Sequence, residues 1–318
     1  MMTSKLKIAS ACTTVLLVLS GCGGSDDSTA ATSTLPSLDN VPVAEATVEN
    51  ATEAVDTVFE AENVSTLGTG LLAVADVQTV GFNSVAFALN QLQAIQEAGT
   101  DVHALNEAVS ESQPCTGGGS IAISGNVTQT TSTLTMVASN CVEGDMTVNG
   151  TIGATLTLSS AGEISYMKLT FNTDYTATGA VSMMVHGGSY MALSFDALSD
   201  PTTGLSSGTA TSSIWFEALG QNMRYDDLTI KFANDSFGDG TECYRNGRIY
   251  INNLSAYMDI DSTYDTNCLD PFTTSSGVLI SGSTRLLGSN GSTVLIDVVS
   301  PDTFLATDEN GNTLETTN

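Results

Sequence analysis

Residues 212–232 read SSIWFEALGQNMRYDDLTIKF, and this stretch decides the fold class. Apolar and polar side chains alternate in it over two runs, whose apolar members are Ile214, Phe216 and Ala218, then Leu228, Ile230 and Phe232. Successive side chains of a strand point to opposite faces of its sheet. The alternation therefore predicts two strands that each bury one face and expose the other.

The same alternation continues on both sides of this stretch. The apolar members of the further runs are Leu156 and Leu158; Met167, Leu169 and Phe171; Met191, Leu193 and Phe195; Val294, Ile296 and Val298. Turn signals fall between the runs at Gly187-Gly188, Asp200-Pro201, Gly238-Asp239-Gly240, Asn290-Gly291 and Asn310-Gly311. About ten to twelve strands without an intervening helix predict an antiparallel β-meander over residues 113–318. So many twisted strands curl, which favours a curled sheet, a barrel-like form or a sandwich.

Residues 42–112 have a different pattern. Apolar side chains recur there in steps of three and four, first at Val48, Ala51, Val55, Val58 and Phe59, then at Phe82, Val85, Phe87, Ala88, Leu92 and Ile95. This spacing is typical of amphipathic helices. We expect three or four helices, and hence an α+β protein with a small N-terminal helical region before the large β domain.

Six cysteines occur in the chain. Cys12 and Cys22 lie in the N-terminal segment discussed below, which leaves Cys115, Cys141, Cys243 and Cys268 for disulfides. Four cysteines allow three pairings. The two spacings of 26 and 25 residues, with similar turn and strand sequences around them, favour Cys115–Cys141 and Cys243–Cys268. A zinc site fits poorly, because no CxxC pair or nearby histidine accompanies them.

The N-terminus has the order of an export signal. Lys5 and Lys7 precede an apolar run at residues 8–19, which is too short to span a bilayer permanently. Leu19-Ser20-Gly21-Cys22 then resembles the lipobox of bacterial lipoproteins. The resemblance implies cleavage of residues 1–21, a diacylglyceryl group on Cys22 and acylation of its new amino terminus, for example by palmitate. We expect the polar residues 22–41 to form a flexible tether.

The family resemblance also predicts a location. Gly23 follows Cys22 where the inner-membrane retention signal of the family has Asp, which implies an anchor in the outer membrane. Periplasmic and surface-exposed orientations both stay open. Residues 1–21 contain two lysines and no acid, so the chain from Cys22 has a formal charge of −29. This charge repels phosphate backbones and argues against nucleic acid as a partner.

Motifs for catalysis are present only in unsuitable contexts. Ser206 is the central serine of G-x-S-x-G at 204–208, but its flanks are polar and lack the strand and helix of a nucleophile elbow. Ser165 and Lys168 match S-x-x-K, yet on a strand they point to opposite faces. His103 and His186 have no second histidine at metal-binding spacing. We interpret these residues as structural.

Acidic turns supply the candidate metal ligands. Asp259, Asp261 and Asp265 lie close in sequence, and weaker groups are Asp235 with Asp239 and Asp308 with Glu309. Calcium prefers several oxygen ligands, but none of these groups has EF-hand spacing. Gly117-Gly118-Gly119 precedes a strand-like run, which argues against a phosphate-binding loop. The sequence predicts no cofactor.

These observations favour a lipid-anchored envelope protein that is not an enzyme. Its partners would be the membrane, through the anchor, and an apolar ligand or another envelope protein. An adhesin-like surface module and a hydrolase using carboxylates are the alternatives.

Overall fold

The computed structural model describes residues 34–54 and 107–317, except for short stretches at 129, 160–163, 180–181, 198–205, 219–220, 235–239, 252–254, 276–277 and 301–302. The lipobox, the expected helices after residue 54 and His103 lie outside the described residues. Among the residues described, no helix combines the length and hydrophobicity needed to cross a bilayer.

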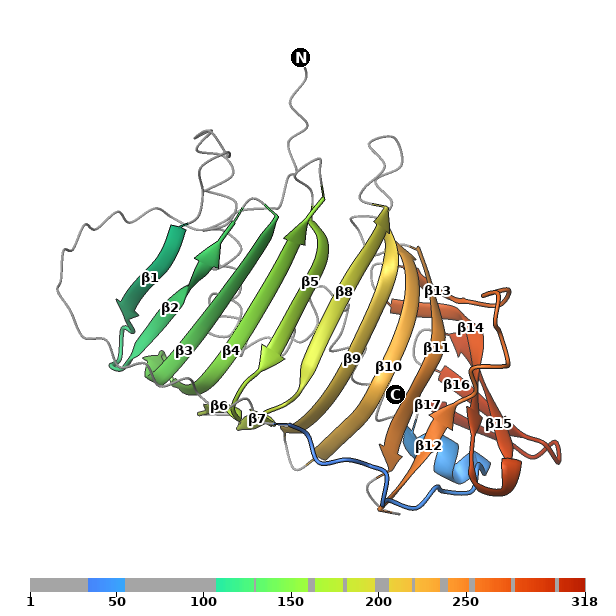
Figure 1. Ribbon diagram of the computed structural model, residues 1–318. Coiled ribbons are helices and arrows are strands. Elements are labelled where there is room, and N and C mark those ends of the chain that lie inside the picture. The colour runs from blue at the N-terminus through green and yellow to red at the C-terminus, as the bar shows by residue number, and fades with distance from the viewer. Residues whose placement is uncertain are drawn as a thin grey trace. The chain divides into compact units, whose positions relative to one another are not determined.

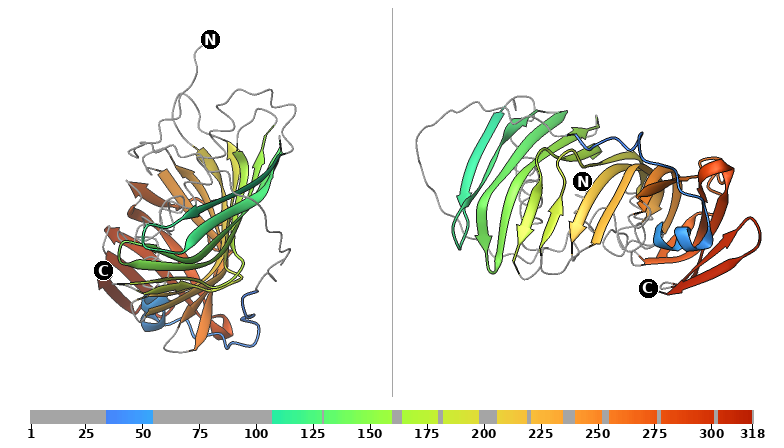
Figure 2. Two further views of the ribbon diagram at one scale, coloured as in Figure 1. Left: turned by 90° about the vertical axis from the view of Figure 1, so that its left-hand side faces the viewer. Right: turned by 90° about the horizontal axis from the view of Figure 1, so that it is seen from below.

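Seventeen strands form one antiparallel sheet (Figure 1). The first nine are β1 (Glu107–Pro114), β2 (Ser120–Val127), β3 (Thr131–Glu143), β4 (Met146–Leu158), β5 (Ile164–Phe171), β6 (Tyr175–Thr178), β7 (Met183–Val185), β8 (Tyr190–Ala197) and β9 (Ser206–Ala218). The others are β10 (Gln221–Asn234), β11 (Gly240–Ile251), β12 (Ala256–Ile260), β13 (Phe272–Ser275), β14 (Val278–Leu287), β15 (Thr293–Ser300), β16 (Thr303–Asp308) and β17 (Thr313–Thr317), with a 3₁₀ turn η4 (Ser289–Gly291) before β15. Figure 2 shows the strand direction turning progressively along the sheet, as expected of twisted strands.

The predicted meander is confirmed, but three of its passes are interrupted. β5 and β6 both pair with β4, β7 and β8 both pair with β9, and β12 and β13 both pair with β11. Each pair of strands is one broken pass, with a break of three residues between β5 and β6, four between β7 and β8 and eleven between β12 and β13. These interruptions account for three of the strands beyond the expected ten to twelve, and they create the irregular sites described below.

One face of the sheet is apolar and buried. Ile214, Ile230 and Ile249 on neighbouring strands are at most 3% exposed and share a core cluster with β14–β16. A short helix over 48–54 adds Val48 and Ala51 to the same cluster. Alternation therefore identified the correct inward face, because a β-strand offers every second side chain to the core.

The opposite face carries rows of hydroxyl side chains. Strand register places one row across β4, β5, β8, β9 and β10 as Thr155, Lys168, Ala192, Thr211 and Thr229. The adjacent row is Thr157, Tyr166, Ser194, Thr209 and Lys231. We call these ten residues the hydroxyl face. Its threonines suit the strand, since β-branched side chains favour extended backbone.

Three expected boundaries differ from the structure, and the first is the start of the helical region, which lies at residue 48 instead of 42. Residues 107–112, expected to be helical, belong to β1, which pairs with β2 across the turn after Cys115. The sheet therefore begins six residues before the expected boundary at 113. Residues 34–41, expected to lie in a free tether, contact the sheet, and Leu38 is 2% exposed. An extended segment packs there because the sheet supplies partners that the local sequence does not reveal.

Both disulfides form within the pairs that the spacing favours. Cys115, after β1, bonds Cys141 in β3, and their Cα atoms are 5.4 Å apart. Cys243 in β11 bonds Cys268 in the loop between β12 and β13, with Cα atoms 5.7 Å apart. The second bond lies beside the part of β11 between its contacts with β13 and β12. It therefore joins two passes where the ladder of hydrogen bonds is interrupted.

Replacing Cys243 and Cys268 together by Ser is expected to lower the free energy of unfolding by about 3 kcal/mol, because a closed loop of this length restricts the unfolded chain. Urea unfolding followed by Trp215 fluorescence measures the change. Cys115→Ser with Cys141→Ser is the matched variant, because the disulfide that it removes closes a loop of similar length. Unfolding at the wild-type urea concentration in both would contradict this role.

Candidate functional site

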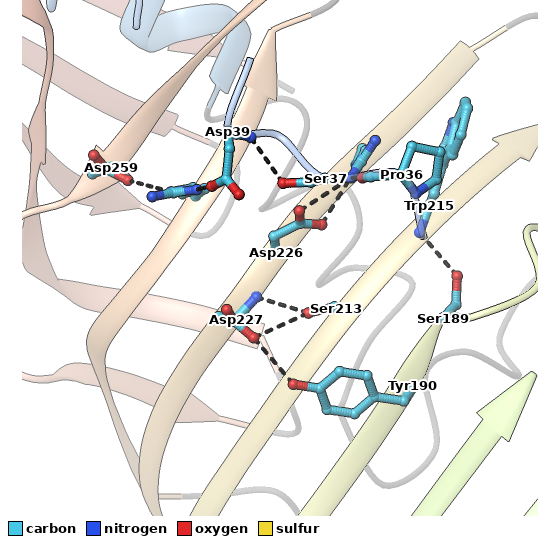
Figure 3. Close-up of polar contacts among 12 residues, drawn as sticks. Pro36, Ser37, Asp39, Ser189, Tyr190, Ser213, Trp215, Asp226, Asp227 and Asp259 are labelled. Carbon is cyan, nitrogen blue, oxygen red and sulfur yellow. Dashed lines mark hydrogen bonds and ion pairs between the residues drawn. The ribbon is translucent and has the colours of Figure 1, made fainter. Parts of the chain in front are cut away.

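The most elaborate polar site of the described chain joins its N-terminal end to the sheet. Residues 34–47, which we call the strap, cross β10, β11 and β12 with a turn at 38–41 and contact side chains about 200 residues later in sequence. Figure 3 shows Pro36, Ser37 and Asp39 of the strap beside Asp226 and Trp215 of the sheet. The residues that hold the strap form what we call the strap seat.

Arg224 on β10 is the centre of the strap seat. Its side chain is only 8% exposed, and its Nη2 donates to the carbonyl oxygen of Pro36. The same guanidinium lies 3.1 Å from Asp226 Oδ2 and 5.3 Å from the ring centre of Trp215. Trp215 stands directly opposite Arg224 on β9. A charge this deeply buried needs such compensation, and Asp226 supplies it.

His186 extends this row to the next strand. It follows β7 at the interruption before β8, where its backbone N–H donates to Trp215 O over 2.9 Å. The imidazole stacks on the Trp215 ring with 3.8 Å between centroids, and its Nε2 lies 2.9 Å from Glu217 Oε1. Trp215 Nε1 donates to Asn222 Oδ1 over 2.7 Å. The indole is thereby fixed between imidazole and guanidinium.

A second arginine holds the strap from β11. Arg248 Nη1 lies 3.3 Å from Asp39 Oδ1, and Arg248 Nε lies 3.4 Å from Asp259 Oδ1. Its guanidinium also lies 5.1 Å from the ring centre of Tyr257. The hydrogen bond from Ser37 and the contact with Arg248 lower the pKa of Asp39. Because these groups are much more exposed than Arg224 and Asp226, this ion pair contributes less to stability.

The second half of the strap behaves as an added strand. Val43 forms a parallel bridge with Tyr257 in β12, and Ala44 N donates to Tyr257 O over 2.8 Å. Ser289 N donates in turn to Ala44 O over 2.7 Å, and Ala46 N donates to Ser292 Oγ over 2.8 Å. Backbone groups of the strap are therefore paired on both sides, as buried peptide groups require.

Two glycines permit this close approach. A Cβ on Gly188 would collide with Leu35 N, and one on Gly288 would collide with Ala46 N. Gly188 also has a φ of +94°, which side chains rarely adopt. Gly187-Gly188 was predicted to be a turn, and the structure shows that this turn also leaves room for the strap.

A second polar cluster lies beside the strap seat. Asp227 sits at a register shift in β10 with a φ of +51°. Its Oδ1 accepts from Tyr190 Oη over 3.2 Å, and its N–H donates to Ser213 Oγ over 2.8 Å (Figure 3). Burial is the main cause that raises the pKa of Tyr190, and the nearby Asp227 carboxylate adds to it. These contacts hold Tyr190 at the border of the hydroxyl face.

The three candidate calcium ligands do not converge. Asp259 pairs with Arg248, and burial raises its pKa despite that partner. Asp261 is 2.6 Å from Arg285 Nη2, whereas Asp265 accepts from the backbone N–H groups of Leu269 and Asp270. No group of three His, Cys, Asp or Glu side chains with metal-binding geometry occurs among the described residues.

The other predicted candidates occupy structural positions. Ser206 begins β9, and Ser165 and Lys168 lie on β5, so neither motif has the helix its chemistry needs. Asp308 accepts from the backbone N–H groups of Asn310 and Asn312 in the turn before β17. Gly117-Gly118-Gly119 forms part of the turn before strand β2, as its sequence indicates. Asp235 and Asp239 lie outside the described residues.

Sequence reasoning missed the strap seat itself. Arg224 and Arg248 are two of only six basic residues after residue 21, and Trp215 is the single tryptophan. The available signal in the sequence was that these rare basic side chains lie on predicted strands of a strongly acidic protein. That signal shows neither their mutual proximity nor the strap that they hold, because both arise from contacts distant in sequence.

Arg224→Ala is expected to lower the free energy of unfolding by about 3 kcal/mol, because it leaves the half-buried Asp226 without its partner. Arg248→Ala removes an ion pair that is far more exposed and is expected to cost less than about 1 kcal/mol. Urea unfolding of both variants measures the difference. Equal losses of unfolding free energy in the two variants would show that the burial of Arg224 does not determine its contribution to stability.

Asp261 gives a pH dependence with a defined sign. Burial raises its pKa, but hydrogen bonds from Thr263 and the Arg285 guanidinium outweigh burial and lower the pKa below 3.8. A carboxylate with a lower pKa when folded stabilises the fold above about pH 4 and loses that contribution as the pH falls. Asp261→Asn should therefore unfold earlier in urea than wild type at pH 7, and the gap should narrow at pH 3. A gap that widens in acid would contradict the ion pair.

No protein-family model, curated protein or solved structure matches this chain.

Proposed function

We propose that this protein is a lipid-anchored component of the bacterial outer membrane that acts by binding a partner rather than by catalysis. The observation that carries the proposal is the strap seat, together with the lipobox-like sequence ending at Cys22. Arg224 donates a hydrogen bond to the carbonyl oxygen of Pro36, which lies only fourteen residues after Cys22. Such a length of chain spans at most about 50 Å when fully extended. An acylated Cys22 would then keep the sheet close to the membrane.

The disulfides support the exported location. Structural disulfides form and persist in oxidising compartments such as the periplasm and the cell surface. Cys115–Cys141 and Cys243–Cys268 use all four cysteines after Cys22. Cys22 is therefore the only cysteine of the processed chain that is left for a lipid.

The polar contacts support a binding role. His186 is engaged with Glu217 and stacked on Trp215, and Asp227 is engaged with Tyr190 and Ser213. These groups fix one another and the strap, which suits a rigid display surface.

We also propose that the sheet is open and curled. Among the described residues, β1 pairs with β2 and β17 pairs with β16, so each has one strand neighbour. This order supports a sheet with two edges, whose outward face is continuous from β4 to β10.

The lipid anchor is tested by Cys22→Ser, with Cys12→Ser as the matched control inside the signal segment. Wild type and Cys12→Ser should incorporate labelled palmitate and pellet with outer membranes. Cys22→Ser should carry no label and leave the membrane fraction, because its anchor is the acyl chains. An unlabelled wild type, or a Cys22→Ser protein that still pellets with membranes, would overturn the proposal.

A further inference from the structure

The hydroxyl face is free of acids in a strongly acidic chain. Its ten residues comprise seven with hydroxyl groups, two lysines and one alanine. The whole chain has 35 Asp and Glu residues against 8 Lys and Arg. These ten side chains therefore carry a charge of +2, and the carboxylate of Asp227 lies at their border through its hydrogen bond with Tyr190.

The two lysines of this face differ from the nearby arginines. Arg224, Arg248 and Arg285 each lie within 3.4 Å of a carboxylate oxygen. For Lys168 and Lys231, no carboxylate of the described residues lies within the 4.0 Å of an ion pair. Lys231 is exposed. The ammonium group of Lys231 is thus open to an anion from outside, and that of Lys168 has no ion-pair partner among the described residues.

The surroundings of Lys168 hold it in place. Its Nζ lies 4.6 Å from the ring centre of Tyr190, and the Tyr190 hydroxyl is fixed by Asp227. A cation above an aromatic ring is attracted to it without being neutralised. The amine is therefore positioned while it keeps its charge.

We propose that the hydroxyl face binds an acidic polysaccharide. Sugar hydroxyls would exchange hydrogen bonds with the threonine and serine rows, and sugar carboxylates would pair with Lys168 and Lys231. This inference rests on the proposed function, since it names the partner of an exported binding protein. Charge complementarity selects an acidic ligand over a neutral one, and the hydroxyl rows select a sugar over other anions.

The spacing of the two lysines suits a polymer. Lys168 lies on β5 and Lys231 on β10, and the register places β8 and β9 between them. Three steps of about 4.8 Å separate the two strands, so the lysine Cα atoms are at least roughly 14 Å apart. An extended chain lying across the strands can contact both lysines and the hydroxyl rows between them.

Acids elsewhere on the protein do not prevent this binding. At physiological salt, charges that are exposed and more than about 8 Å apart are largely screened from each other. Asp227 borders the face, where hydrogen bonds from Tyr190 and Ser213 hold its charged carboxylate in a fixed position. An acidic polymer is therefore repelled from the remaining surface and accepted on this face, which fixes where it binds.

The experiment measures binding of polygalacturonate to the purified, lipidated protein in detergent by calorimetry, with neutral dextran, monomeric galacturonate and duplex DNA as comparison ligands. Binding is expected for polygalacturonate alone. Lys168→Gln with Lys231→Gln should weaken it about tenfold, since two exposed ion pairs are lost. No binding of polygalacturonate would overturn the inference. Equal binding of dextran would exclude the acidic ligand, and equal binding of DNA would exclude the sugar.

The hydroxyl rows are tested separately. Thr209→Val with Thr211→Val keeps strand-forming side chains and removes two hydroxyls, so it should weaken binding several-fold without loss of the fold. Thr303→Val with Thr313→Val makes the same change on β16 and β17 and should leave binding unchanged. Equal effects of both pairs would overturn recognition by this face. Because the lipid anchor is tested by Cys22→Ser, failure of sugar binding is distinguishable from failure of the anchor.

Discussion

The buried guanidinium of Arg224 connects the strap to the middle of the sheet. It lies against Trp215 and Asp226 on the sheet and donates to Pro36 of the strap. A buried cation is stable only when its partners stay in place. The strap, the indole and the carboxylate therefore depend on one another. Through this contact the segment nearest Cys22 becomes part of the folded sheet instead of a free linker.

The interruptions of the strands make this arrangement feasible. A regular pass through residues 171–190 would give ladder positions to His186 and Gly188. The break before β8 instead places His186 on Trp215 and lets the strap reach the backbone at Gly188. The break between β12 and β13 is joined to β11 by Cys243–Cys268. The breaks before β8 and between β12 and β13 are thus each accompanied by a specific contact where the ladder of hydrogen bonds is interrupted.

The sequence predicted those features that depend on neighbouring residues. Alternation identified the inward Ile214 and Ile230, and similar spacing of the cysteines identified both disulfides. Part of the shortfall in the predicted strand number arises because a broken pass reads as one alternating run or as an ordinary turn, as at β5 with β6. The polar composition of residues 22–41 predicted a flexible tether. The structure differs because the burial of Leu38 depends on a sheet about 190 residues later in sequence. Local patterns carry no information on such distant partners.

Hydrogen exchange of the backbone amides of residues 34–47 tests most directly whether the strap is a fixed part of the sheet. Val41 N donates to Leu38 O and Ala44 N to Tyr257 O, so both amides should exchange slowly, at rates similar to those of β10 and β11. Exchange of these two amides at the rate of an unstructured peptide, while β10 and β11 stay protected, would contradict the account.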